Sequence, residues 1–200
     1  MTIISIECPE ELPHNSLLNR EHLLKRDIFP HFINGIYGET FGILPSRPYN
    51  VDNPGRGDLT PISQVGLTLS HYMAWTVCAN LPGEEFLILE DDARFPEDWV
   101  TKLALAKSDL PDDWEIFLIG NSNTSDKEKR HVCGDVWEVK YPFCTHAYIL
   151  KRRALPVLLT SCRDATTKID LLMIREAYPK LRVYTMLPRL VEQRGTDLAV

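Results

Sequence analysis

Apolar residues along this chain fall into short runs that alternate with stretches of helical spacing. The run FLIL at residues 86–89 is typical of a strand that is buried on both faces. Apolar residues at every fourth position from Val65 to Val77 predict a helix. Thr60 is a suitable cap for that helix, and Pro61 suits its first position. The same patterns predict strands at residues 3–7, 115–119, 136–139, 147–150 and 181–186, and helices that contain Leu17, Leu18, Leu23 and Leu24 or span residues 97–106, 153–160 and 170–177.

The order of these elements predicts the fold class. Strands that alternate with helices indicate an α/β domain with a largely parallel sheet. Residues 45–58 hold three prolines and two glycines, so we expect an irregular loop there. The polar residues 121–130 form a second expected loop and the best candidate for disorder. With 200 residues and 44% hydrophobic content, we expect one domain over residues 1–200.

Composition narrows the functional classes. The 22 Lys and Arg against 28 Asp and Glu give a net charge of -6, which does not favour nucleic acid as a partner. We find no signal peptide at the N-terminus and no apolar stretch that reaches the roughly 18 residues of a membrane-spanning helix. The five cysteines lack any CxxC spacing and indicate reduced thiols. We therefore expect a cytoplasmic protein without a transmembrane segment, and peripheral contact with a membrane stays open.

The acidic triplet Glu90-Asp91-Asp92 directly follows the run at residues 86–89. Three carboxylates at the end of a buried strand repel one another, and a cation or strong hydrogen bonds must offset that repulsion. Strand alternation would place Glu90 and Asp92 on one face and Asp91 on the other. Such an arrangement suits Mg²⁺ or Mn²⁺ held by one or two carboxylates together with diphosphate oxygens. The alternative is a solvated turn in which Asp91 and Asp92 cap the following segment.

Several segments, in order, resemble glycosyltransferase family 25, the group that includes lipooligosaccharide and procollagen galactosyltransferases. Each segment is weak evidence alone, but their order and spacing cover essentially the whole chain. They are LTPISQVGLTLSHYMAW (59–75), FLILEDDARF (86–95), WEIFLIGN (114–121), CTHAYILKRRAL (144–155), IDLLM (169–173) and MLPRLVEQRGTD (186–197).

The resemblance implies a GT-A-like fold, a single α/β domain whose mostly parallel central sheet is flanked by helices. It also implies a UDP-sugar donor, usually UDP-galactose or UDP-glucose, inversion at the anomeric carbon, and a role in lipopolysaccharide biosynthesis. Two departures stand out. Ile6-Glu7-Cys8-Pro9 replaces the family's usual donor segment, which leaves Arg20 as the one plausible donor-contacting arginine nearby, and Cys144 stands where the family tends to have glycine.

Two histidine motifs have both a structural and a functional interpretation. Gly66, Ser70 and Ala74 form a small-residue face that another element could pack against. The resemblance instead favours contact of Ser70 and His71 with the donor. His146 is either a satisfied structural residue or a ligand of Mn²⁺, since imidazole can bind that ion.

Asp170 is the candidate general base that deprotonates the acceptor hydroxyl. The structural interpretation makes it a first-turn acid favoured by the helix dipole. Asp91, Asp164 and Glu176 are the alternatives as base, and Asp91 is also expected to contact the donor. Gln193 belongs to a tail expected to fold over the donor.

These residues together predict a metal-dependent, inverting transfer of a hexose from a UDP-sugar to an acceptor hydroxyl. Asp92, Glu90 and His146 would bind Mn²⁺ or Mg²⁺. The acceptor is left open between a glycan, a lipid-linked sugar, a protein side chain and a modified nucleobase. The alternatives are a protein that binds nucleotide-sugars or carbohydrate without catalysis, and a metal-dependent phosphoryl-transfer enzyme.

Overall fold

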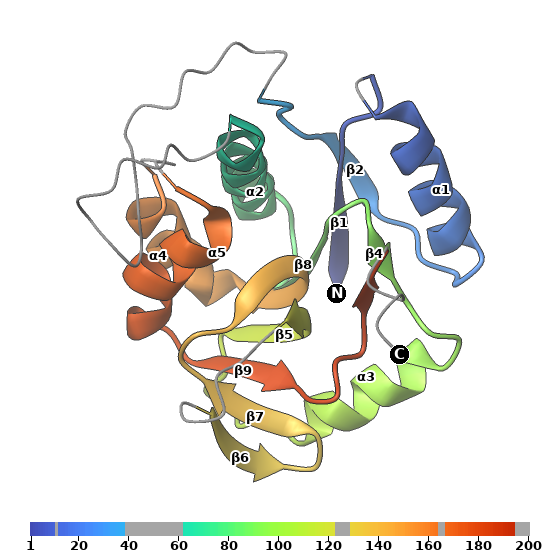
Figure 1. The fold of residues 1–200 in the computed structure, drawn as a ribbon. Coiled ribbons are helices and arrows are strands. Elements are labelled where there is room, and N and C mark those ends of the chain that lie inside the picture. The colour runs from blue at the N-terminus through green and yellow to red at the C-terminus, as the bar shows by residue number, and fades with distance from the viewer. Residues whose placement is uncertain (11, 39–61, 123–128, 164–166, 195–200) are drawn as a thin grey trace.

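A computed structural model describes residues 1–10, 12–38, 62–122, 129–163 and 167–194 of the chain. One sheet has eight strands in the order β2-β1-β3-β8-β5-β9-β7-β6, and β4 and β10 form a separate ladder (Figure 1). The strands are β1 (Thr2–Glu7), β2 (His31–Asn34), β3 (Glu85–Leu89), β4 (Ala93–Arg94), β5 (Ile116–Ser122), β6 (Lys129–Cys133), β7 (Val136–Val139), β8 (Phe143–Lys151), β9 (Val183–Met186) and β10 (Glu192–Gln193). The helices are α1 (Pro13–Leu24), α2 (Ile62–Asn80), α3 (Trp99–Ser108), α4 (Leu155–Ser161) and α5 (Ile169–Leu172), with short helical turns η2 (Arg152–Ala154), η3 (Met173–Ala177) and η4 (Tyr178–Lys180).

The pairings within the large sheet are mixed. β1 runs parallel to β2 and β3, and β5 runs parallel to β9. β8 lies antiparallel between β3 and β5, and the β6–β7 hairpin adds further antiparallel pairings next to β9. The predicted α/β class is confirmed, but the expectation of a mostly parallel sheet is wrong. The chain passes from β5 to β8 through the β6–β7 hairpin, with no helix among the described residues of that link, so β8 returns antiparallel.

Two hydrophobic cores lie on opposite faces of the sheet. Along β3, Phe86 and Ile88 belong to one core and Leu87 and Leu89 to the other, and all four are fully buried. Helices α2, α4 and α5 cover the first face and α3 covers the second (Figure 1). Burial of each such side chain contributes about 1.5–3 kcal/mol to folding. β3 is therefore a firmly held central strand.

Most of the predicted helices and strands are present within a few residues of their expected bounds. The patterns of apolar residues did not predict β2, β6 or the β4–β10 ladder, which are short or lie at a sheet edge. The expected loop at 121–130 begins and ends in strand residues of β5 and β6, and its residues 123–128 lie outside the described part. The predicted capping by Thr60 and Pro61 and the loop at 45–58 also lie outside it.

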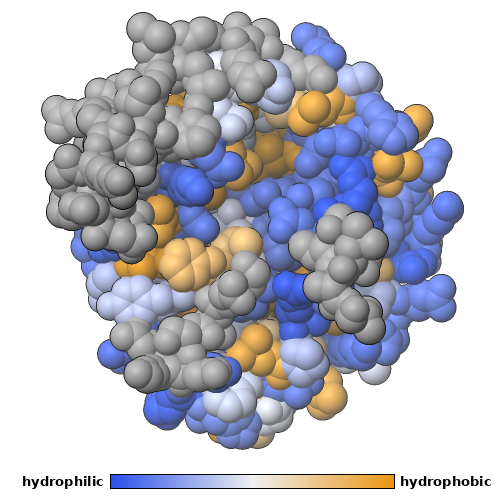
Figure 2. Space-filling model, in the orientation of Figure 1, coloured by the Kyte–Doolittle hydropathy of each residue, from blue (hydrophilic) through white to orange (hydrophobic). Residues whose placement is uncertain are grey.

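The described helices and the visible surface bear on membrane contact. None of the helices in the described part of the chain is long and apolar enough to span a bilayer. Figure 2 shows hydrophilic residues over much of the right of this face, around α1, with hydrophobic residues gathered in separate patches. The described residues therefore contain no candidate membrane span.

Candidate functional site

The acidic triplet forms a turn between β3 and β4. β3 ends at Leu89, and Glu90, Asp91 and Asp92 are not strand residues, so the prediction from strand alternation does not hold for them. All three are partly buried. The antiparallel neighbour β8 begins beside this turn, and the backbone N–H of Glu90 donates to the carbonyl of His146 at 2.9 Å. The turn is thus enclosed by the protein and does not project freely into solvent.

The carboxylate of Glu90 is held by two side chains from different elements. Its Oε1 accepts hydrogen bonds from Thr145 Oγ1 at 2.8 Å and from His71 Nε2 at 3.2 Å. Burial opposes ionisation of Glu90, but the hydrogen bonds from His71 and Thr145 outweigh it and lower the pKa of the carboxyl group. Glu90 is therefore a fixed, ionised acid with a side chain only 14% exposed.

Asp91 and Asp92 have the opposite electrostatic character. Burial and the neighbouring charge of Asp92 raise the pKa of Asp91 to about 6. Burial and Glu90 also raise the pKa of Asp92. Gln193 Nε2 donates to Asp92 Oδ2 at 2.7 Å, whereas the buried Oδ1 has no hydrogen-bond partner among the described residues. A cation would relieve the repulsion between these acids and satisfy the unpaired oxygen.

A small cavity of about 160 Å³ opens beside Glu90. It gathers four predicted site residues, Glu90, His146, Asp170 and Gln193, from the turn after β3, from β8, from α5 and from β10. Gln64, Leu67, Cys144, Thr145 and Ile169 complete its lining. The cavity therefore joins a candidate base to the acidic turn, although 80 residues separate Glu90 from Asp170 in the sequence.

The two carboxylate oxygens of Asp170 differ in how closely they are hydrogen-bonded. Its Oδ1 accepts the backbone N–H of Leu171 at 2.8 Å, as the structural interpretation expects for a first-turn acid. Its Oδ2 is 3.5 Å from the backbone nitrogen of Cys144, which is long for a hydrogen bond. The second oxygen is therefore the one suited to take a proton. Asp164, an alternative base, lies outside the described residues.

His146 is buried, at 1% exposure, and fixed by one of its ring nitrogens. Its Nε2 lies 3.1 Å from the carbonyl oxygen of Val191, so Nε2 carries the proton that this contact needs. The other nitrogen, Nδ1, is buried without a hydrogen-bond partner. Among the described residues, no three His, Cys, Asp or Glu side chains form a ready-made metal cage. The predicted ligands Asp92, Glu90 and His146 therefore do not make a complete site by themselves.

Ser70 has two hydrogen bonds within the protein, and its predicted contact with the donor stays a prediction. Its hydroxyl accepts the backbone N–H of Ile36 at 2.7 Å and donates to the carbonyl of Gly66 at 2.8 Å, and the residue is 2% exposed. A Cβ on Gly66 would come within 2.6 Å of the backbone nitrogen of Gly38. The small-residue face of α2 thus packs against the chain after β2, as the structural interpretation expected.

His71 is fully buried, and its predicted contact with the donor also stays a prediction. Its Nε2 lies 3.2 Å from Glu90 Oε1, which links it to the acidic turn. Arg20 is paired with the buried Glu7, whose Oε2 accepts from Arg20 Nε at 2.8 Å, and its guanidinium lies over the ring of Phe32. That pair is electrostatically linked to the acidic turn, since the charge of Glu7 also raises the pKa of Asp91.

Thr145 belongs to the site but was not predicted as a site residue, whereas Arg194 lies beside Gln193 in the tail expected to fold over the donor. Thr145 precedes His146 in the Thr-His motif of the resemblance, and that motif could have indicated it. Arg194 donates its backbone N–H to the carbonyl of Asp92 at 2.8 Å, and its charge acts on Asp91. One guanidinium nitrogen, Nη1, is buried, and no described residue is hydrogen-bonded to it. Arg194 is therefore placed to donate to an anionic ligand.

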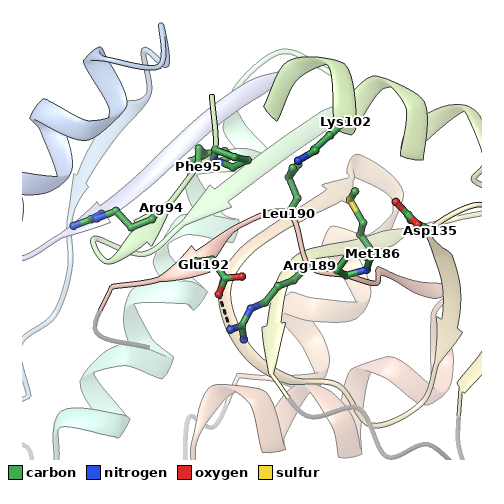
Figure 3. Close-up of a pocket in the computed structure, with 10 residues that line it drawn as sticks. Arg94, Phe95, Lys102, Asp135, Met186, Arg189, Leu190 and Glu192 are labelled. Atoms are coloured by element: carbon green, nitrogen blue, oxygen red, sulfur yellow. Dashed lines mark ion pairs between the residues drawn. The ribbon is translucent and has the colours of Figure 1, made fainter. Parts of the chain in front are cut away.

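A second cavity, of about 390 Å³, lies along the β4–β10 ladder (Figure 3). Its lining includes Arg94, Lys102, Arg189 and Glu192 but none of the predicted site residues. Figure 3 shows Arg189 turned toward Glu192, and their ion pair measures 2.5 Å. Lys102 is likewise paired with Asp98 at 3.0 Å. These paired charges make the larger cavity a weaker candidate than the cavity at Glu90.

A mixed sheet with helices on both faces, and an acidic turn after β3, correspond to a GT-A-like fold. The chain is similar to the crystal structure of a glycosyltransferase involved in the glycosylation of the major capsid of PBCV-1, with a TM-score of 0.57. The alignment covers 98% of this chain and 92% of that one at 13% sequence identity, so it bears on the fold alone.

The chain belongs to glycosyltransferase family 25. The family model described as "Glycosyltransferase family 25 (LPS biosynthesis protein)" matches residues 56–173, more than half of the chain. Human procollagen galactosyltransferase 2 is 25% identical over 140 residues, which cover 64% of this chain and 22% of the human protein. A glycosyltransferase 25 family member of Anopheles gambiae is 28% identical over 103 residues, 49% of this chain and 17% of that protein. The chain thus spans about a fifth of the length of these relatives.

Proposed function

We propose that this chain transfers a hexose, galactose or glucose, from a UDP-sugar to an acceptor hydroxyl, with inversion and with a divalent cation. The observation that carries the proposal is the cavity that joins Glu90 to Asp170 beside the turn of Asp91 and Asp92. Family membership supports a nucleotide-sugar donor. The galactosyltransferase name of the human relative supports galactose as the first sugar to test.

The chemistry needs a base on one side of the sugar and charge stabilisation on the other. Asp170 Oδ2 takes the proton of the acceptor hydroxyl. The acceptor oxygen then forms a bond to the anomeric carbon, and the bond from that carbon to the UDP oxygen breaks. UDP leaves with the electron pair, and attack opposite the leaving group inverts the configuration. Arg194 Nη1, which lacks a partner, donates to a diphosphate oxygen.

The residues at the turn fit a hard divalent cation. Asp92 offers a buried, unpaired Oδ1, and Glu90 is ionised and lines the cavity. Mg²⁺ and Mn²⁺ sites are commonly completed by substrate phosphates when the protein gives only one or two carboxylates. Asp92 and Glu90 would hold the ion together with diphosphate oxygens of the donor. When bound, the ion would neutralise charge that develops on the leaving diphosphate.

The acceptor and the location are proposed only by class. The family description names lipopolysaccharide biosynthesis, which favours a glycan or lipid-linked sugar. The human relative is named for procollagen and the solved structure for a capsid protein, so a protein acceptor is the second class to test. The cytoplasm is the proposed location.

The test measures UDP release and sugar transfer from UDP-galactose and UDP-glucose with and without Mn²⁺. We expect Asp92→Ala to lose at least about 100-fold in kcat, as removal of a major electrostatic stabiliser does. We expect Asp170→Asn to lose transfer while it retains binding of UDP. Asp112→Asn, at an exposed acid, is the matched control and should be unchanged.

Full activity of Asp92→Ala would exclude the metal role. Binding of UDP without any turnover by the unmodified chain would identify a non-catalytic nucleotide-sugar-binding protein. Release of phosphate without sugar transfer would instead favour a phosphoryl-transfer enzyme.

A further inference from the structure

A line of buried hydrogen bonds connects the hydrophobic core to the acidic turn. Trp75 Nε1 donates to the hydroxyl of Tyr148 at 2.8 Å. That hydroxyl lies 3.0 Å from His71 Nδ1, and His71 Nε2 lies 3.2 Å from Glu90 Oε1. Trp75, Tyr148 and His71 are each fully buried. This line, Trp75–Tyr148–His71–Glu90, crosses from α2 to β8, back to α2, and then to the end of β3.

The donors in the line determine where each proton lies. The indole N–H of Trp75 can only donate, so the oxygen of Tyr148 accepts from it. The proton of the Tyr148 hydroxyl then points to His71 Nδ1, which must accept. A neutral imidazole with a bare Nδ1 carries its proton on Nε2, which donates to Glu90. With the partners that the described residues offer, any other placement of the His71 protons leaves at least one of these buried groups without a hydrogen bond.

Neighbouring rings also fix the orientation of the imidazole. The rings of His71 and Tyr148 are stacked, with centroids 5.7 Å apart and planes 24° apart. The ring of Trp75 lies 6.4 Å from that of His71 on the same helix. The hydrogen bonds therefore determine the tautomer of His71, and the ring contacts fix the orientation of its imidazole.

We propose that His71 is a positioning residue for the reaction: its Nε2–H fixes the carboxylate of Glu90 at the cavity, and Tyr148 fixes His71. This inference rests on the proposed sugar transfer, because it assigns the use of Glu90 in that reaction. His71 and Thr145 both donate to the same oxygen, Oε1. Glu90 lines the cavity, so these two bonds hold its carboxylate at the cavity wall. Errors of about 1 Å in such a group cost up to about 100-fold in rate.

The first experiment needs no activity. Long-range ¹H–¹⁵N NMR on the metal-free chain should show His71 Nε2 protonated and Nδ1 bare. Tyr148→Phe should change the ¹⁵N shifts of His71, because it removes the donor to Nδ1. A proton on Nδ1 of the unmodified chain would overturn the inference even if the enzyme proves active.

The second experiment compares two variants that each remove one buried hydrogen bond. Tyr148→Phe removes the partner of His71, whereas Tyr178→Phe removes a buried hydrogen bond to Met173 Sδ and leaves the line Trp75–Tyr148–His71–Glu90 intact. With folding verified by circular dichroism, we expect Tyr148→Phe to lower kcat at least about 10-fold, with KM for the UDP-sugar changed little. Tyr178→Phe should lower kcat less than about 3-fold. Equal losses in both variants would show a merely structural role.

A rescue variant completes the test. His71→Gln places an amide N–H where Nε2 stands and should retain part of the kcat that His71→Leu loses. Full kcat in a folded His71→Leu would contradict the positioning role. If the unmodified chain transfers no sugar from any donor, the proposed function fails, and the NMR result still decides the arrangement of His71.

Discussion

Asp91→Asn is expected to stabilise the folded chain at neutral pH in the absence of metal. Burial and the charge of Asp92 raise the pKa of Asp91 from its ordinary value of 3.8 to about 6, with smaller contributions from Glu90 and Glu7. At pH 7.5 Asp91 is ionised in both states, so folding must bring an unfavourable charge into the turn. Asparagine has nearly the same shape and lacks that charge.

The size of the gain follows from the pKa of the folded state. At about 1.4 kcal/mol for each pKa unit, the rise to about 6 corresponds to at most about 3 kcal/mol. Asp91 is partly exposed, and solvent screening reduces this to about 1–2 kcal/mol. The stability contributed by protonated Asp91 is complete below about pH 3.8 and is lost as the pH rises through about 6.

The assay is urea denaturation with a chelator present, at pH 7.5 and at pH 4. We expect Asp91→Asn to exceed the unmodified chain by about 1–2 kcal/mol at pH 7.5 and to lose most of that advantage at pH 4. Asp112→Asn should differ from the unmodified chain by less than about 0.5 kcal/mol at both values. An Asp91→Asn variant that is no more stable at pH 7.5, or equally favoured at pH 4, would refute the electrostatic argument.

Three further perturbations test the surrounding structure. Burial lowers the pKa of His22 to about 4, and its Nε2 accepts the backbone N–H of Phe95 at 2.8 Å. The stability that neutral His22 contributes should be complete above pH 6.5 and should be lost as the pH falls toward 4. His22→Gln should therefore lose less stability in acid than the unmodified chain, as measured by urea titrations. Gly66→Ala should lower the free energy of unfolding by about 1–3 kcal/mol, because the new methyl group meets the backbone of Gly38; an unchanged midpoint would contradict that packing. Cys144 has a φ of 65°, so Cys144→Gly should raise the melting temperature and Cys144→Ala should not.

Local patterns in the sequence predicted the centre of the fold well. The four apolar residues of β3 are buried on both faces, and the acids that follow them lie at the site. The departure at Cys144 also has a physical explanation, since a backbone with positive φ favours the glycine that the family tends to have there. These features depend on neighbours in sequence, which is why a single sequence reveals them.

Contacts between distant segments could not be predicted in the same way. The sequence does not show that β8 runs against β3, although that direction brings Thr145 and His146 to the acidic turn. Gln193 donates to Asp92 across 101 residues, and only the ladder of β4 and β10 makes that pairing visible. The residues proposed for the metal and the donor meet only through such long-range pairings, so variants of these residues test the proposal.

Ser70 and His71 show why neighbours in a motif can differ in function. Successive helical residues point about 100° apart, so one turn of α2 presents the two side chains to different surroundings. Ser70 meets the chain after β2, and its hydroxyl is used by Ile36 and Gly66. His71 contacts Tyr148 of β8 and donates a hydrogen bond to Glu90. A histidine on a buried helix can therefore serve a catalytic site by positioning another side chain. The role proposed for His71 is of this kind, because its hydrogen bond holds the carboxylate of Glu90.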